Sequence, residues 1–329
     1  MDVKCNDLIS AKLTTQYPAM SATAKNWISG ISECKWIEEY FCWLNNQLIH
    51  LRPKQRKQII ERLVSEHDTK YHESIAEIVY IAFWNYVNWS FDKDPKINGK
   101  TPDFRVFYGE DNKYSFLCDV TVVRHNQPHH DLVIDGKRGI MTMDGKPIDE
   151  LPVATQPINQ SHRFLMRIKE KLDKYRQILT IEDKPFVICF FQYKFEDILY
   201  LDDFQIRNAL FGDLTVNFRT GEFWHQPSID ITQHDQKVNR GIFGFEEYSH
   251  VAAVIVCKQE FHPTSNIMLE RPKPHYPQKA KFSFAIYSNP LGKWTHRDDN
   301  PFSLLGLPVN GLKDVDTLEF CDQKEIEFY

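Results

Sequence analysis

The stretch Phe116-Leu117-Cys118-Asp119-Val120-Thr121-Val122-Val123 does most to decide the fold of this chain. It is rich in β-branched and apolar residues, which predicts a strand buried on both faces. A carboxylate in such a strand is costly to bury unless it is paired or binds a cation. The sequence therefore indicates both a central strand and a special role for Asp119.

The residues before this strand predict that it belongs to a β-hairpin. A second strand is expected from Asp103 to Tyr108, and the turn Gly109-Glu110-Asp111-Asn112 joins the two. A loop from Asp92 to Thr101 precedes them, because Pro95 and Asn98-Gly99 are turn signals.

Helices are predicted upstream of the hairpin. Apolar residues between Tyr71 and Trp89 form a wide stripe, so this helix is expected to be largely buried, and it carries Glu77. Glu73 lies four residues earlier, and only one of the two acids need face inward. The stretch from Trp36 to Leu44 and the stretch from Lys54 to Val64 predict two further amphipathic helices. The second has a basic face that could contact phosphates, although a solvated face is the commoner explanation.

Downstream of the hairpin, the chain is predicted to alternate helices and buried strands. The polar segment 124–160 is too long for a plain connection and indicates an insertion or an active-site flap. The expected elements that follow are a helix from Ser161 to Leu179, a central strand from Phe186 to Phe191, a helix from Asp202 to Phe211 ended by Gly212, and strands from Val251 to Cys257 and from Phe282 to Tyr287. The tail after Asn289 is expected to be irregular.

This order predicts an α/β fold with a mixed central sheet flanked by helices. We expect an N-terminal helical region (1–70), a core (71–290) and a C-terminal tail (291–329). The sequence leaves open whether the N-terminal helices pack on the core or form an appendage.

Composition limits the class of protein. The chain has 329 residues, of which 42% are hydrophobic and 13% aromatic, so it can bury a sizeable core. A formal net charge of −5 gives no overall attraction for polyanions, although basic residues need only line one groove. No apolar run is long enough to span a membrane, and the first residues lack a signal-peptide pattern, so no membrane partner is expected. The seven cysteines, without a C-x-x-C pair, favour buried thiols and a reducing cytoplasm.

Glu77, Asp103 and Asp119 are candidates for a shared site. A divalent cation such as Mg²⁺ prefers oxygen ligands and is usually held by one or two carboxylates, waters and substrate phosphate. A hairpin can bring Asp103 and Asp119 together, and a packed helix can bring Glu77 to the same edge. Two alternatives stay open: Asp103 could shape a turn, and Asp119 could form a buried salt bridge with a lysine or arginine.

The motifs Thr101-Pro102-Asp103-Phe104 and Cys118-Asp119-Val120-Thr121, with Glu77 in a helix, resemble the PD-(D/E)XK nuclease superfamily. They are similar to a bacterial group in which the last motif reads acid-x-Thr instead of acid-x-Lys. The resemblance extends from Tyr71 to Pro290, and it implies a restriction-endonuclease-like core. It further implies that Asp103 and Asp119 bind Mg²⁺ or Mn²⁺, with the Val120 carbonyl as a third contact and Glu77 in support.

The motif lysine is replaced by Thr121, whose short neutral hydroxyl cannot do the same chemistry. In this family a neighbouring element can supply the lysine, and Lys171 in the following helix is the first candidate. Lys174 lies three residues on, near the same face. Arg124 and His125, just past the strand, could also reach a phosphate.

The resemblance leads us to expect a metal-dependent nuclease acting on DNA or RNA, with a setting in bacterial defence. The competing expectations are a catalytically inactive nuclease fold that binds nucleic acid or a partner protein, and a structural subunit of a larger assembly. A homo-oligomer stays open. A zinc site at Cys118, His125, His129 and His130 is disfavoured by spacing. The chain has neither a nucleophile elbow nor a phosphate-binding loop of the NTPases.

Overall fold

A computed structural model describes most of the chain, and the description covers residues 20–21, 24, 35–123, 160–193, 201–216, 219–220, 223–231, 237–259, 282–294 and 317–319. These residues divide into two compact units. The first comprises 1–122, 171–200 and 246–329, and the second comprises 123–170 and 201–245. The predicted insertion at 124–160 lies almost wholly outside the described residues.

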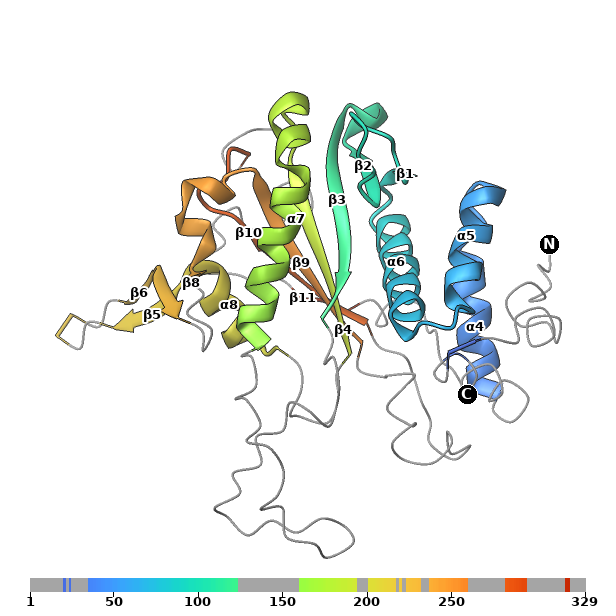
Figure 1. The fold of residues 1–329 in the computed structure, drawn as a ribbon, viewed down its shortest axis with the longest axis horizontal. Coiled ribbons are helices and arrows are strands. Elements are labelled where there is room, and N and C mark those ends of the chain that lie inside the picture. Colours follow the sequence, from blue (N-terminus) through green and yellow to red (C-terminus); the bar gives the residue numbers. More distant parts are fainter. Residues whose placement is uncertain are drawn as a thin grey trace, which may run out of the picture. The chain divides into compact units, whose positions relative to one another are not determined.

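The first unit is built on a seven-stranded sheet (Figure 1). Its strands, in spatial order, are β1 (Ser90–Lys93), β2 (Phe104–Tyr108), β3 (Tyr114–Val122), β4 (Phe186–Tyr193), β9 (Val251–Gln259), β10 (Phe282–Ser288) and β11 (Thr317–Glu319). The strands β3, β4 and β9 are parallel to one another, and the outer pairs are antiparallel. The predicted α/β fold with a mixed central sheet is therefore confirmed.

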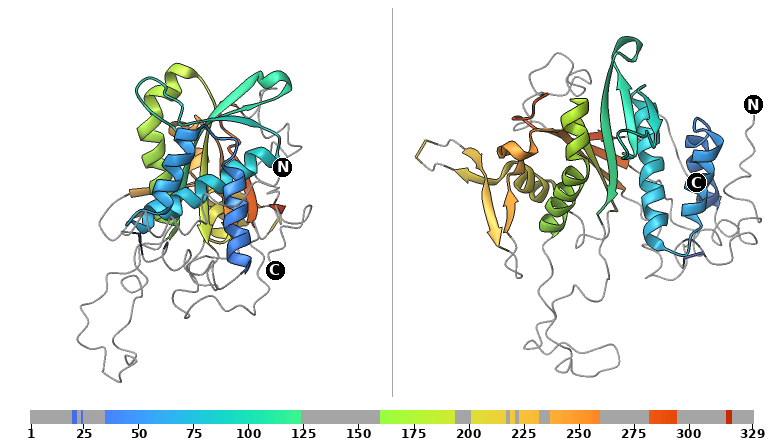
Figure 2. Two further views of the ribbon diagram at one scale, coloured as in Figure 1. Left: turned by 90° about the vertical axis from the view of Figure 1, so that its right-hand side faces the viewer. Right: turned by 45° about the horizontal axis from the view of Figure 1, so that its top comes forward.

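Strand β4 lies at the centre of the sheet because its residues are apolar on both faces. Phe186 through Phe191 are all fully buried, and they pair with β3 on one side and β9 on the other. A continuous apolar run is what a strand covered on both faces requires. The β2–β3 hairpin, visible as the green strands of Figure 2, also forms as predicted.

Helix α6 (Asp68–Tyr86) covers one face of this sheet, and α4 (Lys35–Gln47) and α5 (Pro53–Leu63) pack beside it (Figure 1). The hydroxyl of Tyr80 on α6 donates a hydrogen bond to the sheet at the Phe190 carbonyl, over 2.7 Å. Trp43 of α4 stacks on Phe282 of β10, with ring centroids 5.2 Å apart. The N-terminal helices therefore pack on the core, which answers the question that the sequence left open.

The opposite face of the sheet is covered by the part of α7 (Gln160–Glu182) from Lys171 onward, which belongs to the first unit. The Tyr175 ring contacts Phe186 of β4 at 5.5 Å between centroids. Because side chains alternate along a strand, β3 presents Cys118 and Val120 to the core cluster under α6 and Asp119 to α7.

The second unit holds α8 (Asp203–Phe211) and two small hairpins. The first pairs β5 (Asp213–Val216) with β6 (Phe223–Gln226), and the second pairs β7 (Ser228–Ile231) with β8 (Lys237–Arg240). Gly212 ends α8 as predicted, at φ 103°. A Cβ there would lie 2.2 Å from the Gln226 carbonyl oxygen, so this corner requires glycine.

The sequence missed several short strands. Strand β1 overlaps the start of the segment that we expected to be a loop, at Asp92 and Lys93, and β11 lies in the tail that we expected to be irregular. The hairpins of the second unit were also missed. Strands of three or four residues are too short to show a period of two, and their pairing decides them.

Two further expectations concern cysteines and membranes. Cys118, Cys189 and Cys257 are buried free thiols as expected, but Cys42 is disulfide-bonded, so the expectation is wrong for that residue. Within the part of the chain that the structure describes, no helix combines the length and apolarity needed to cross a bilayer.

Candidate functional site

Asp103 lies at the point where β2 begins. The first antiparallel pair joins Phe104 to Cys118, so the next step of this register would set Asp103 beside Asp119. Pro102 has no N–H and cannot continue the ladder. Instead, the Val120 N–H donates to Oδ2 of Asp103 over 2.7 Å. Asp103 is thus anchored to the neighbouring strand, whereas a turn-shaping aspartate would bond its own backbone.

Asp119 is almost completely buried, at 1% exposure, and it is held by three side chains of α7. Lys171 forms an ion pair with its Oδ2. The Tyr175 hydroxyl lies 2.5 Å from its Oδ1, and the Lys174 ammonium lies 3.8 Å from the same oxygen. Lys171, Lys174 and Tyr175 share one helix face because they are three and four residues apart.

The ionisation of this site follows from its burial and its charges. Burial, with the neighbouring carboxylates of Asp119 and then Glu77, raises the pKa of Asp103 from 3.8 to about 8. Among the described residues, Asp103 has no ion-pair partner. Burial alone would lower the pKa of Lys171, but the charge of Asp119, the hydrogen bond to it and the charges of Asp103 and Glu73 together outweigh burial and raise that pKa. Lys171 is therefore an ammonium ion at neutral pH, suited to stabilise negative charge and unsuited to act as a base.

Glu77 faces inward, and Glu73 is exposed. Arg62 of α5 donates to both Glu77 oxygens, each over 2.6 Å. The Lys93 ammonium lies 2.7 Å from Glu77 Oε2 and 2.9 Å from Asp94 Oδ1, with its side chain only 1% exposed. Burial would raise the pKa of Glu77, but Lys93 and Arg62 outweigh it and lower that pKa.

The three predicted carboxylates therefore approach one end of the sheet from different sides. Asp119 faces α7, Glu77 comes from α6 on the other face, and Asp103 lies at the strand end between them. Within the described ranges, no group of three or more histidine, cysteine or acidic side chains stands ready to hold a metal ion. The cations Arg62 and Lys93 bind Glu77 instead.

A divalent cation nevertheless fits part of this arrangement. Mg²⁺ needs only one or two protein carboxylates when waters and phosphate complete its shell. Asp103 and Asp119 meet that requirement, since continuing the β2–β3 register sets them side by side and Asp103 forms no ion pair with another described residue. Glu77 fits less well, because Arg62 and Lys93 bind both of its oxygens. Asp119 is also engaged at both oxygens, by Lys171 and Tyr175, and a bound cation would have to displace these contacts.

The structure brings together most of the predicted site residues. Lys171, predicted to replace the motif lysine, contacts Asp119, and Lys174 lies nearby. The Val120 N–H contacts Asp103, while the predicted role of its carbonyl stays a prediction. Arg124 and His125 lie outside the described residues, as do His129 and His130.

Sequence reasoning missed three residues of the site. Lys93 was assigned to a loop, Arg62 to a basic helix face that is more commonly solvated, and Tyr175 was given no role in the site. The available signal for Lys93 and Arg62 was the burial of Glu77, because an inward carboxylate on an apolar helix requires cationic partners.

The chain was compared with protein-family models, with curated proteins and with solved structures, and none of them matched. The class of the protein has to be argued from the site itself.

Proposed function

We propose that this protein is a divalent-metal-dependent nuclease that hydrolyses phosphodiester bonds of DNA or RNA. One observation carries the proposal. Continuing the β2–β3 register sets Asp103 beside Asp119 at the open end of the hairpin, and Lys171 contacts Asp119 as the resemblance to PD-(D/E)XK nucleases leads us to expect of a replacement lysine.

Each residue would have a distinct role. Asp103 and Asp119 would hold Mg²⁺ or Mn²⁺, which would neutralise phosphate charge and lower the pKa of the attacking water. Lys171 would add positive charge next to Asp119, where negative charge develops on the phosphate. Tyr175 fixes the orientation of Asp119, and Glu77 supports the site by holding Lys93 and Arg62. The reaction adds water across one P–O bond, and the leaving oxygen takes up a proton.

The wider setting is part of the same proposal. The buried free thiols favour a cytoplasmic protein, although the disulfide at Cys42 argues against extending this to every cysteine. A role in bacterial defence rests on the family resemblance alone.

The first prediction concerns Asp119. Purified full-length protein should cleave labelled single- or double-stranded DNA or RNA with Mg²⁺ or Mn²⁺, and it should not cleave with a chelator. The Asp119→Asn variant should lose at least about 100-fold in rate, because it removes a metal-binding charge. Cleavage that survives the chelator, or full activity in this variant, would refute the proposal.

The second prediction concerns the replacement lysine. Lys171→Ala should reduce the cleavage rate about 100-fold, since a half-buried positive charge next to the reacting phosphate is lost. Lys171→Arg, which keeps the charge, should recover part of the rate. Lys174→Ala is the matched control: its side chain is 48% exposed, so we expect less than about a threefold change. Equal rates for the Lys171→Ala variant and the unmodified protein would show that Lys171 has no catalytic role.

One observation favours the alternative of an inactive nuclease fold. Lys171 and Tyr175 already engage both oxygens of Asp119, so these contacts could replace a metal ion. That alternative predicts no shift in melting temperature on adding Mn²⁺ and no cleavage by the unmodified protein, with nucleic-acid binding retained.

A further inference from the structure

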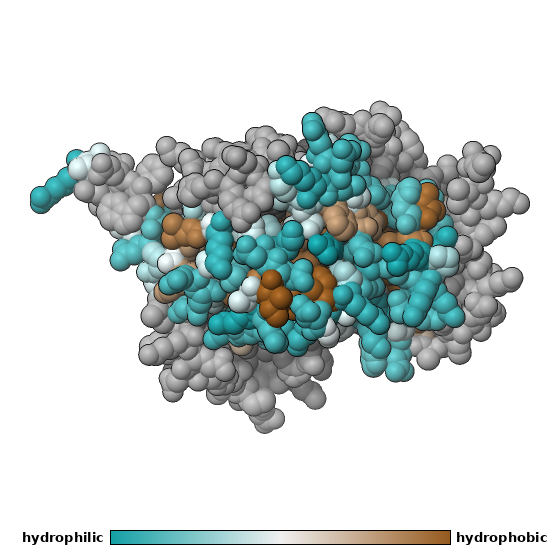
Figure 3. All heavy atoms as spheres, turned by 90° about the horizontal axis from the view of Figure 1, so that it is seen from above, coloured by the Kyte–Doolittle hydropathy of each residue, from teal (hydrophilic) through white to brown (hydrophobic). Residues whose placement is uncertain are grey.

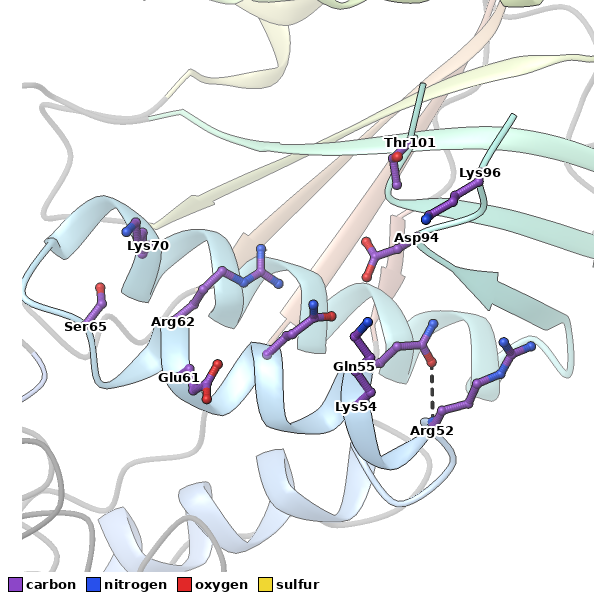
Figure 4. A pocket seen from close by; sticks show the side chains of 11 residues that line it. Arg52, Lys54, Gln55, Glu61, Arg62, Ser65, Lys70, Asp94, Lys96 and Thr101 are labelled. Carbon is purple, nitrogen blue, oxygen red and sulfur yellow. Dashed lines mark hydrogen bonds between the residues drawn. The ribbon is translucent and has the colours of Figure 1, made fainter. Parts of the chain in front are cut away.

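A groove of about 740 Å³ runs along α5 (Figure 4). We call it the α5 groove. Its lining residues come from α5 and its ends, from the start of α6 and from the loop between β1 and β2. They are Arg52, Lys54, Gln55, Gln58, Glu61, Arg62, Ser65, Lys70, Asp94, Lys96 and Thr101.

The α5 groove is positively charged although the chain as a whole carries a net charge of −5. Five of its lining side chains are cationic and two are acidic. Both acids are paired, Asp94 with Lys93 at 2.9 Å and Glu61 with Lys57 at 3.7 Å. The positive charge of the groove is therefore only weakly opposed from within.

Three of the cations are available to a ligand. Lys54, Lys70 and Lys96 are exposed, and they form no ion pair with any other described residue. Lys96 is presented by a tight turn in which Ile97 and Lys100 exchange backbone hydrogen bonds, each over 2.9 Å. Asn98 and Gly99 in this turn have positive φ angles, as two-residue hairpin turns require.

The shape of the groove fits an extended anion. The eleven residues of α5 correspond to an axial length of about 16 Å. Figure 4 shows Lys70 toward one end of the groove and Lys96 toward the other. A single phosphate could not contact both, whereas a chain with a regularly repeated negative charge could.

The groove is also connected to the candidate site. Arg62 lines the groove and binds both oxygens of Glu77. The Thr101 carbonyl oxygen lies 3.2 Å from the Tyr175 hydroxyl, which contacts Asp119. The Asp94 N–H donates to the Asp103 carbonyl over 2.9 Å. A ligand in the groove would lie next to the backbone that positions Asp103.

The surface offers little support for an apolar partner. The described residues expose only scattered large apolar side chains, and in Figure 3 the apolar areas on the visible face are small and separated by hydrophilic residues. Charge is the property that sets the α5 groove apart.

We propose that the α5 groove binds the sugar-phosphate backbone of a nucleic-acid strand through Lys54, Lys70 and Lys96, on the flank of the carboxylate site, an inference that rests on the proposed nuclease function. Phosphate contacts of this kind position the strand and carry no sequence information. The groove thereby supplies the local basic surface that the overall charge of the chain does not.

The test compares two triple variants with equal loss of charge. One is Lys54→Ala/Lys70→Ala/Lys96→Ala, and the control is Lys113→Ala/Lys169→Ala/Lys184→Ala, whose positions do not line the groove. Binding of labelled single-stranded and duplex oligonucleotides is measured by fluorescence anisotropy in chelator over a range of salt concentrations. The groove variant should bind about 100-fold more weakly at moderate salt. The slope of its plot of log affinity against log salt concentration should be smaller in magnitude by about 2 to 3. The control should match the unmodified protein.

Each outcome decides one of the two proposals. If the groove variant and the control bind alike, the α5 groove is not the phosphate site, even if the unmodified protein cleaves. If the unmodified protein does not cleave but only the groove variant loses binding, the nuclease proposal fails and the groove proposal stands. If cleavage occurs, the groove variant should have a raised KM. Binding to vesicles of anionic lipid without binding to oligonucleotides would overturn the groove proposal.

Discussion

Replacing Lys93 by methionine is expected to destabilise the folded chain by about 3 kcal/mol or more. The Lys93 side chain is 1% exposed, and it lies against Glu77, which is also buried, and against Asp94. Removing one partner of a buried ion pair leaves the other charge without full compensation, and Arg62 alone then has to balance Glu77. Urea denaturation followed by circular dichroism measures the change.

Two further variants make this prediction specific. Lys100→Met changes an exposed lysine in the following loop and should alter the stability by less than about 0.5 kcal/mol. The double variant Glu77→Gln/Lys93→Met removes both charges and should recover a large part of the loss. If Lys93→Met alone is as stable as the unmodified chain, the buried pair does not stabilise the fold.

Replacing Asp103 by asparagine should stabilise the metal-free protein, and the gain should depend on pH. The pKa of Asp103 is raised to about 8 in the folded chain, so the folded state retains a proton that the unfolded state has lost at neutral pH. The stability that Asp103 contributes is complete below about pH 4 and is lost as the pH rises through 8. Asparagine has no such proton to lose and keeps an acceptor for the Val120 N–H.

Each pKa unit corresponds to about 1.4 kcal/mol. Since the Asp103 side chain is partly exposed, solvent screening reduces the effect, and we expect a gain of about 3 kcal/mol at pH 8. At pH 4 the two proteins should be equally stable in chelator. Adding Mg²⁺ at pH 8 should raise the melting temperature of the unmodified protein and leave that of the Asp103→Asn variant unchanged. A variant less stable than the unmodified protein in chelator at pH 8 would contradict this account.

Glu77 and Asp103 are expected to make opposite contributions to the stability of the folded chain. Glu77 forms ion pairs with Arg62 and Lys93, whereas Asp103 forms none with another described residue and has a raised pKa. A carboxyl group whose pKa is raised by burial and by a second carboxylate is the kind of local cost that functional sites carry. This contrast makes Asp103 a better candidate for cation binding than Glu77.

Much of the fold could be predicted because its main elements have strong local patterns. Strand β4 is predicted by its apolar run and helix α6 by its apolar stripe. The hairpin of β2 and β3 is predicted by the turn residues between them. The short strands β1 and β11 could not be predicted, because a strand of three or four residues depends on its partner. The missed β1 mattered most, since it carries Lys93.

The candidate site, like the fold, could be predicted in part from the sequence. The sequence by itself determined that Asp119 lies in a buried strand and that Glu77 lies on a buried helix. It also determined that Asp103 stands at the start of the strand that pairs with the Asp119 strand. Each of these follows from the neighbouring residues, because apolar patterns and turn signals are local. Burying a carboxylate among apolar side chains has a high cost, which marks these acids as candidates for a site.

Only the tertiary structure decided which cations balance these acids and on which face of the sheet. Tyr175 meets Asp119 across 56 residues of sequence, and Arg62 meets Glu77 across 15. Such pairings depend on how α5, α6 and α7 pack on opposite faces of the sheet, and no local periodicity encodes them. The sequence therefore located the charges that need partners, and the packing of the helices selected the partners.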